Sequence, residues 1–212
     1  MDSVIKKILS AGVAKGGAAV AGFLLVVAVT RTLSAEDAGL YLFGYTLFSV
    51  LTVFFRLGLD NVIIRGYSSY GISALVNSNF ITGSTWVLIF SSIFSSVCIF
   101  AIFIMGVYGY VGVATAKVIV GVLIVAPLAS LFMIYSFAQQ GLGRPVWSSI
   151  FQSLGHLTVF LVILCLVNLL VDDIGLDVIL WVFISSILIV FIYFIISAFN
   201  MGVLKIENIK KW

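Results

Sequence analysis

The sequence predicts an all-α integral membrane protein with six transmembrane helices, and three observations carry this prediction. Of its 212 residues, 63% are hydrophobic and 9% are charged, whereas about a quarter of a soluble domain is charged. The mean hydropathy is +1.29. Four stretches contain no Asp, Glu, Lys or Arg: 66–116, 118–143, 145–171 and 178–204. Each can cross a hydrocarbon core roughly 30 Å thick, because a helix rises about 1.5 Å per residue.

The six spans are expected to be helices, because backbone groups without hydrogen-bond partners are too costly in lipid. A single six-helix bundle would occupy the whole chain, with little room for a separate soluble catalytic domain. Lys6 and Lys7 precede the first apolar stretch, as in a signal peptide, but no small-residue cleavage site follows. The first span is therefore expected to be uncleaved. The expected ranges are 8–30, 35–55, 79–105, 116–139, 145–171 and 178–199.

Local signals place several of these boundaries. Ser34 and Asp37 form an S-x-x-D capping box before the second helix. The charge-free stretch after Arg65 is too long for one span, so its polar beginning and its Gly/Tyr-rich end are taken as flanks of the third helix. Pro145 suits the first turn of the fifth helix. Pro127 lies inside the fourth helix and is a candidate hinge, with static packing as the alternative.

The positive-inside rule orients the bundle. Nine of the eleven basic residues fall on one side of the six predicted spans. We therefore expect both termini to be cytoplasmic (N-in/C-in), in a multi-pass protein. The basic residues of this side are Lys6, Lys7, Lys15, Arg56, Arg65, Arg144, Lys205, Lys210 and Lys211, and the opposite side holds Arg31, Lys117, Glu36, Asp37, Asp172, Asp173 and Asp177.

Two basic residues are the candidate substrate-binding cations. Lys15 lies eight residues beyond Lys7, roughly 12 Å deeper along the helix axis. Its long side chain either reaches back to the lipid headgroups or faces a water-filled cavity and attracts an anion. Arg56 is four residues from Asp60, so it either pairs with that carboxylate or lines the cytoplasmic mouth of a cavity. For each residue both alternatives stay open.

Two polar residues inside the fifth span are one helical turn apart. Gln152 and His156 either satisfy other polar groups across helix contacts or take part in proton relay, because histidine titrates near neutral pH.

Catalytic chemistry has almost no candidates in this sequence. Asp172, Asp173 and Asp177 could suggest the metal–diphosphate site of a prenyl- or glycosyl-transferring membrane enzyme, but no second acidic cluster faces them. There is no HExxH motif, no G-x-S-x-G motif, no P-loop and no Cys/His cluster. We therefore expect no enzymatic activity, no cofactor, no metal site and no nucleic-acid partner, and we read the acidic run as a short solvated loop.

The sequence resembles the opening of polysaccharide-biosynthesis flippases of the Wzx type, within the multidrug/oligosaccharidyl-lipid/polysaccharide exporter superfamily. The resemblance covers most of the chain. Its marks are Arg31-Thr-Leu at the end of the first helix, Asp37-Ala-Gly-Leu-Tyr at the start of the second, and Arg56-Leu-Gly-Leu-Asp60 with Arg65 after it. The stretch QQGLGRPVWSSIFQSLGHL, residues 139–157, resembles the family's connection between the fourth and fifth helices.

The resemblance implies a function and a site. Members of that family move a polyprenyl-diphosphate-linked oligosaccharide from the cytoplasmic to the outer leaflet by alternating access, without ATP hydrolysis, in the synthesis of surface polysaccharides such as O-antigen. They have two six-helix lobes around a cationic cavity, to which Lys15 and Arg56 would correspond. The lysine departs from the arginine that some relatives use, so it offers a point charge rather than a bidentate contact. The implied location is the bacterial inner membrane.

Length is the main departure, because the six predicted spans match the N-terminal lobe alone. Three explanations stay open: a truncated sequence, a disrupted remnant, or two chains that pair into a two-lobed homodimer. The alternative function is a non-transporting remnant or assembly partner of the polysaccharide machinery.

Overall fold

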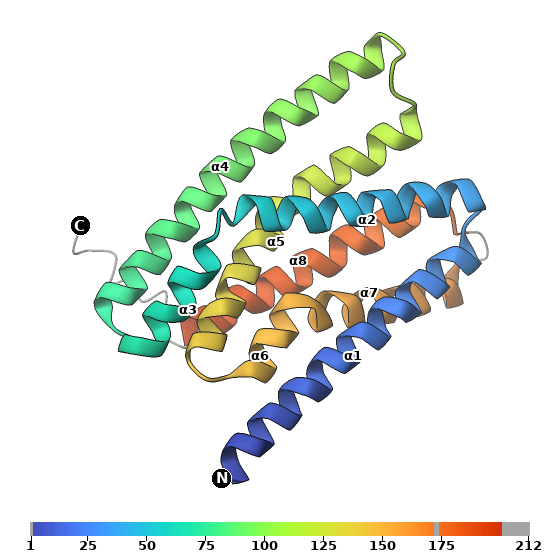
Figure 1. Cartoon of the computed structure of the whole chain (residues 1–212). Coiled ribbons are helices and arrows are strands. Elements are labelled where there is room, and N and C mark those ends of the chain that lie inside the picture. Colours follow the sequence, from blue (N-terminus) through green and yellow to red (C-terminus); the bar gives the residue numbers. More distant parts are fainter. Residues whose placement is uncertain (1, 172–173, 201–212) are drawn as a thin grey trace.

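The chain folds into a bundle of long helices (Figure 1). The computed structural model describes residues 2–171 and 174–200, and no strand occurs within these ranges. Asp172, Asp173, Lys205, Lys210 and Lys211 lie outside the described residues, and so do the side chains of Lys6 and Lys7. The helices are α1 Asp2–Thr32, α2 Ala35–Phe55, α3 Leu59–Tyr70, α4 Ala74–Val107, α5 Val113–Gly141, α6 Pro145–Ser149, the π-helix η1 Ile150–Leu154, α7 Gly155–Leu170 and α8 Leu176–Asn200.

Within the described ranges, five helices are long and apolar enough to cross a membrane: α1, α2, α4, α5 and α8. A sixth span arises if residues 145–152 and 155–170, which meet at a bend of 51°, are counted as one. The prediction of an all-α membrane protein is therefore confirmed, and the number of candidate spans agrees with six when the bent pair is included. Such a set of apolar helices indicates a multi-pass membrane protein.

Two predicted helix starts are present. The backbone N–H of Asp37 donates to Oγ of Ser34 at 3.2 Å, which caps α2, and the Ser34 hydroxyl in turn lies 3.1 Å from the Asp37 carboxylate. Pro145 opens α6, where its missing N–H leaves no intrahelical hydrogen bond unmade. Both starts follow from local chemistry, so they could be predicted without tertiary information.

The short helix α3 was not expected from the sequence. Leu57 and Gly58 have φ of 50° and 77°, a left-handed pair that ends α2 and redirects the chain. The new helix is amphipathic, and it buries Ile63 and Tyr67. The Tyr67 hydroxyl donates to Oδ1 of Asn77 at 3.1 Å, which ties α3 to the start of α4. The sequence predicts that the polar residues of this region flank a span, whereas α3 is a separate helix that packs against the first turns of α4 and the end of α5.

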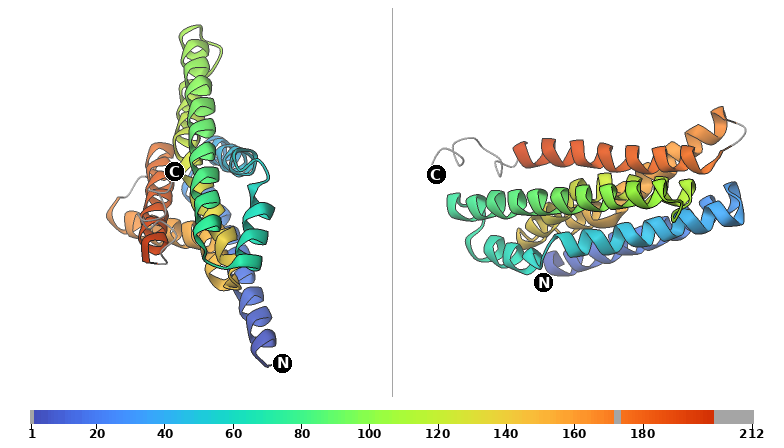
Figure 2. Two further views of the ribbon diagram at one scale, coloured as in Figure 1. Left: turned by 90° about the vertical axis from the view of Figure 1, so that its left-hand side faces the viewer. Right: turned by 90° about the horizontal axis from the view of Figure 1, so that it is seen from above.

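Helix α5 forms the centre of the bundle and packs against α2, α3, α4 and α8 (Figures 1 and 2). The helices approach closely at Gly44 of α2, because a Cβ there would collide with Cγ1 of Val118. Small residues permit this contact, as is usual between helices in lipid. At the C-terminus of α2, Arg56 contacts Met133 of α5. The two contacts show that α2 and α5 run in the same direction.

Helix α8 also runs in the direction of α5. Lys117 in the first turns of α5 forms an ion pair of 2.8 Å with Asp177 at the start of α8. Near the opposite ends, the hydroxyls of Tyr135 and Ser197 are 2.8 Å apart. The C-terminal ends of α2, α5 and α8 therefore lie at the same end of the bundle. Arg56, which follows α2, and Arg144, which follows α5, lie at this end too. The described residues Lys117 and Asp177 lie at the opposite end of the bundle. The assignment of the end with Arg56 and Arg144 to the cytoplasm stays a prediction.

Candidate functional site

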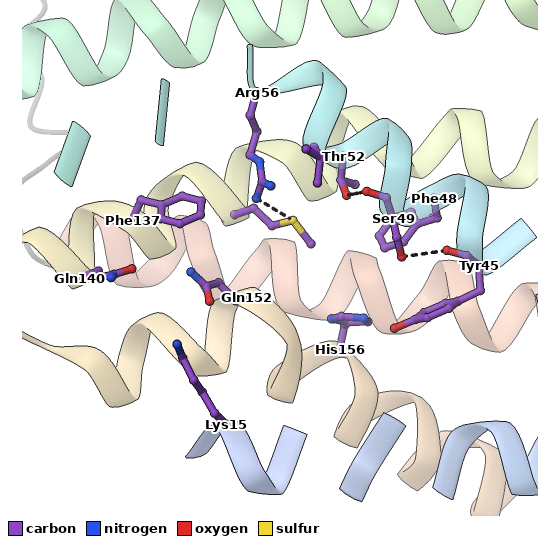
Figure 3. Close-up of a pocket in the computed structure, with 12 residues that line it drawn as sticks. Lys15, Tyr45, Phe48, Ser49, Thr52, Arg56, Phe137, Gln140, Gln152 and His156 are labelled. Atoms are coloured by element: carbon purple, nitrogen blue, oxygen red, sulfur yellow. Dashed lines mark hydrogen bonds between the residues drawn. The ribbon is translucent and has the colours of Figure 1, made fainter. Parts of the chain in front are cut away.

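A cavity of about 540 Å³ opens between α1, α2, α5 and the bent η1–α7 segment (Figure 3). Four residues proposed from the sequence line it: Lys15, Arg56, Gln152 and His156. They come from distant parts of the chain, and the tertiary structure brings them together. The other lining residues are Tyr45, Phe48, Ser49, Thr52, Val53, Met133, Phe137 and Gln140.

Arg56 caps the C-terminus of α2 and is 8% exposed. Its Nε lies 3.5 Å from Oδ1 of Asp60, and its Nη1 donates to Sδ of Met133 at 3.4 Å. The guanidinium also lies over the ring of Phe137, 5.2 Å from the centroid, within the range of a cation–π contact. The ion pair with Asp60 and the place in the cavity wall had been alternatives, but the structure contains both.

Burial shifts the pKa of both members of this pair, in opposite directions. It raises the pKa of Asp60, and the nearby Arg56 opposes that rise. Burial likewise lowers the pKa of Arg56, and the attraction of Asp60 opposes that change. Because an arginine starts so far above neutral pH, the guanidinium keeps its charge. The cavity therefore has a permanent cation with a weakly held counterion.

Lys15 extends from α1 on the opposite side of the cavity from Arg56 (Figure 3). One face of α1 packs against the fifth span. A Cβ added at Gly17 of α1 would lie 3.6 Å from Cδ1 of Leu154. A Cβ at Gly12 or Gly16 would meet nothing within 4 Å among the described residues. Gly12 and Gly16, which have the spacing of a GxxxG motif, thus do not make this contact. Lys15 is an exposed side chain at the cavity margin.

His156 lies in the first turn of α7 and is buried, with 4% of its surface exposed. Its ring packs against Phe48, with the centroids 6.2 Å apart. Neither ring nitrogen has a hydrogen-bond partner among the described residues. The alternative in which His156 is satisfied across a helix contact is therefore not found there. Because buried polar groups are nearly always paired, a polar occupant of the cavity would complete this site.

The bend that positions Gln152 and His156 depends on a glycine. In η1 the backbone follows a π-helical turn, and a Cβ on Gly155 would lie 2.7 Å from the carbonyl oxygen of Ile150. Single π-turns of this kind are frequent at functional sites. Pro127, the hinge candidate, is buried inside α5 and does not line the cavity. Its role as a hinge stays a prediction, and the described break lies in the fifth span instead.

Sequence reasoning missed the α2 wall of the cavity. Tyr45, Ser49, Thr52 and Arg56 are separated by four, three and four residues, so they form one stripe along the helix. This spacing is visible in the sequence, but the predicted site includes only Arg56, at the charged end of the stripe. The hydroxyls of the stripe extend the polar lining away from Arg56.

The lining favours an anion over a cation. It contains a guanidinium, an ammonium group, the amides of Gln140 and Gln152 and several hydroxyls, and no carboxylate appears among the lining residues given above. Groups of three or more His, Cys, Asp or Glu that could hold a metal are absent from the described residues. Such donor groups suit a phosphate-type ligand with neighbouring polar substituents.

Comparison with known proteins gives a family for this chain. The family model described as "polysaccharide biosynthesis protein" matches residues 4–211. Searches of curated proteins and of solved structures gave no significant match. Because the family model covers nearly every residue of the sequence, the chain belongs to the polysaccharide biosynthesis protein family.

Proposed function

We propose that this chain is the N-terminal lobe of a flippase for a polyprenyl-diphosphate-linked oligosaccharide, acting in the inner membrane of a bacterium. Membership of the family supports a role in polysaccharide biosynthesis or export. The observation that carries the finer proposal is the placement of Lys15 and Arg56 on one cavity whose lining residues include no carboxylate. The substrate carries its negative charge on the diphosphate, and it would place that group between the two cations.

The rest of the cavity suits the remainder of such a substrate. A diphosphate in a low-dielectric site needs compensating positive charge and hydrogen-bond donors. Gln140 and Gln152 add amide donors near the cations. The hydroxyls of Ser49 and Thr52 line the α2 wall, where they donate to the carbonyl oxygens of Tyr45 and Ser49 and offer their oxygens to the cavity. Tyr45 and Phe48 add aromatic surface at the end toward His156, where a sugar ring could pack. The polyprenyl chain would remain in the bilayer.

Movement between leaflets requires a second body that closes the cavity alternately on each side. We expect a second six-helix unit, either another lobe or a second copy of this chain, to cover the open side of the cavity. Both ends of the six-span unit are expected on the cytoplasmic side, so such a unit can be repeated without inversion. The two lobes would then rock against each other around a fixed site.

Complementation of a strain lacking its own flippase tests the proposal. Lys15→Ala and Arg56→Ala, made in the complete protein, should abolish polymer export, whereas Lys117→Ala at the other end of the bundle should retain it. Unchanged export in both cavity variants would contradict the assignment. Asp172→Asn and Asp173→Asn should have no effect, since loss of activity in either would favour a membrane enzyme. If the chain binds the lipid-linked substrate but never restores export with any second unit, an assembly partner becomes the better interpretation.

A further inference from the structure

A second cavity, of about 260 Å³, lies between the C-terminal ends of α5 and α8 and the start of α6. It shares no lining residue with the first cavity. The two cavities come nearest in sequence at Gln139, which lines the second, and Gln140, which lines the first. Its polar lining consists of Arg144, Gln139, Ser197 and Asn200. No carboxylate occurs among its lining residues. The cavity is therefore suited to a negatively charged group that is distinct from the transported substrate.

The turn after α5 places the cation. Gly143 has a φ of 70°, a conformation that favours glycine, and the backbone N–H of Arg144 donates to the carbonyl oxygen of Gln139 at 3.0 Å. This hydrogen bond folds the chain back over the last turn of α5, so Arg144 lies at the cavity rather than farther along the connection. On the wall formed by α8, the hydroxyl of Ser197 is held in place by a 2.8 Å hydrogen bond with the hydroxyl of Tyr135.

Aromatic rings form a rigid outer wall. The rings of Trp147 and Tyr193 stack with centroids 6.4 Å apart, and Tyr193 stacks in turn on the buried Phe151 at 5.6 Å. Trp147 and Tyr193 are 43% and 42% exposed, so their outer surfaces face the surroundings of the bundle. Tryptophan and tyrosine are enriched at the level of lipid headgroups, where an amphipathic ring has both apolar and polar contacts.

The cavity also continues into an apolar surface. Ile196 lines it and is itself exposed, and Ile192 and Phe199 are exposed on the same helix, α8. Because α5 and α8 are both apolar spans that end here, the cavity lies where the hydrocarbon region gives way to the headgroups. A free anion would use the polar part alone, whereas a phospholipid would use the arginine, the rings and the apolar surface together.

We propose that this cavity binds the phosphate of an anionic phospholipid headgroup, with an acyl chain lying along the exposed apolar residues of α8. Arg144 contacts the phosphate, the amides and the hydroxyl of the lining contact the polar part of the headgroup, and Trp147 and Tyr193 pack against the glycerol region. Basic pockets between transmembrane helices are known to take such headgroups. A bound lipid would join the ends of α5, α6 and α8.

The test measures lipid binding to the purified full-length chain by native mass spectrometry, with phosphatidylglycerol, phosphatidylcholine of the same acyl chains, and inorganic phosphate as competitor. Phosphatidylglycerol should bind preferentially, and Arg144→Gln should weaken it roughly 10- to 150-fold, the loss expected from one charge-assisted hydrogen bond. Lys117→Gln, which removes a cation at the opposite end of the bundle, should leave the affinity unchanged.

Three outcomes would overturn the proposal: equal binding of both lipids, unchanged binding in Arg144→Gln, or displacement by inorganic phosphate at the same concentration as lipid. The last result would indicate a site for a free anion. The melting temperature of Arg144→Gln in phosphatidylcholine shows whether the variant is folded. If it is not, Arg144→Lys serves instead, because a point charge should bind more weakly than the planar guanidinium, and an affinity equal to that of the wild type would contradict the assignment.

Discussion

Exchange of Arg56 for glutamine and of Asp60 for asparagine should have opposite effects on the binding of a polyprenyl diphosphate. The two side chains form an ion pair at 3.5 Å, and Arg56 also lines the larger cavity. If Arg56 only held α2 against α3, either substitution would break the same contact. If Arg56 binds the diphosphate, Asp60 competes with the ligand for the guanidinium. The Asp60→Asn variant should then bind the ligand as tightly as the wild type or more tightly.

The distances set the expected magnitudes. At 3.5 Å and an effective dielectric constant of about 20, the Coulomb attraction of the pair is roughly 5 kcal/mol before hydration is counted. The cost of removing the Asp60 carboxylate from water exceeds this attraction, because its pKa is raised rather than lowered, so the ionised pair adds no net stability to the fold. Loss of the guanidinium contact to a diphosphate costs roughly 1.5–3 kcal/mol, which is a 10- to 150-fold weaker affinity.

Ligand-dependent thermal shifts of the purified variants provide the assay. Arg56→Gln should lose most of the shift caused by polyprenyl diphosphate, and Arg56→Lys should retain part of it as a point charge. The matched control is Lys117→Gln, whose cation lies at the other end of the bundle. A parallel loss of affinity in Arg56→Gln and Asp60→Asn would refute the competition and leave Arg56 a structural role.

The same pair gives a pH dependence with a defined sign. Burial raises the pKa of Asp60 above its unfolded value near 3.9, so the folded state binds this proton more tightly than the unfolded state. As the pH falls from neutral through the raised pKa, the wild type should gain stability relative to Asp60→Asn. Its affinity for the diphosphate should approach that of the variant over the same range. A difference in melting temperature between the wild type and Asp60→Asn that stays the same at every pH would contradict this assignment.

Three further predictions concern two close contacts of the backbone and one exposed ion pair. Gly44→Ala should cost about 1–3 kcal/mol of unfolding free energy in detergent, since its Cβ meets Val118, and Val118→Ala should restore part of that loss; strictly additive costs would argue against the contact. Gly155→Ala should cost a similar amount, because the new Cβ meets a backbone carbonyl in the π-turn, and a wild-type melting temperature would exclude that turn. Asp177→Asn should cost at most about 1 kcal/mol, because its pair with Lys117 is exposed, and added salt should remove the difference.

The spanning helices could be predicted because they depend on local composition. A charge-free run such as 178–204 has no stable state in water, and in lipid its backbone must satisfy itself as a helix. The starts at Ser34 and Pro145 depend on one or two neighbouring residues and were also predictable. The fifth span was less regular than expected, because its break at Gly155 arises from a π-turn that composition does not encode.

The candidate site was only partly predictable. Lys15, Arg56, Gln152 and His156 could be singled out because polar groups in apolar segments are costly and therefore rare. Helical spacing also showed that residues such as Tyr45 share a stripe with Arg56. The spacing does not show which faces of the helices contact one another. In a soluble protein the apolar face of each helix turns to the core, whereas nearly every face of these helices is apolar.

Composition and charge were enough to predict a membrane-spanning chain, the approximate place of each span, and the few polar side chains that need an explanation. The central place of α5, the packing of α3 against the start of α4, and the two different cavities faced by consecutive glutamines are visible only in the assembled bundle. The physical reason is that the cost of exposing polar groups to lipid acts on each segment separately. Helix arrangement instead depends on close contacts between particular side chains, such as Gly44 against Val118, which form only when the whole bundle is assembled.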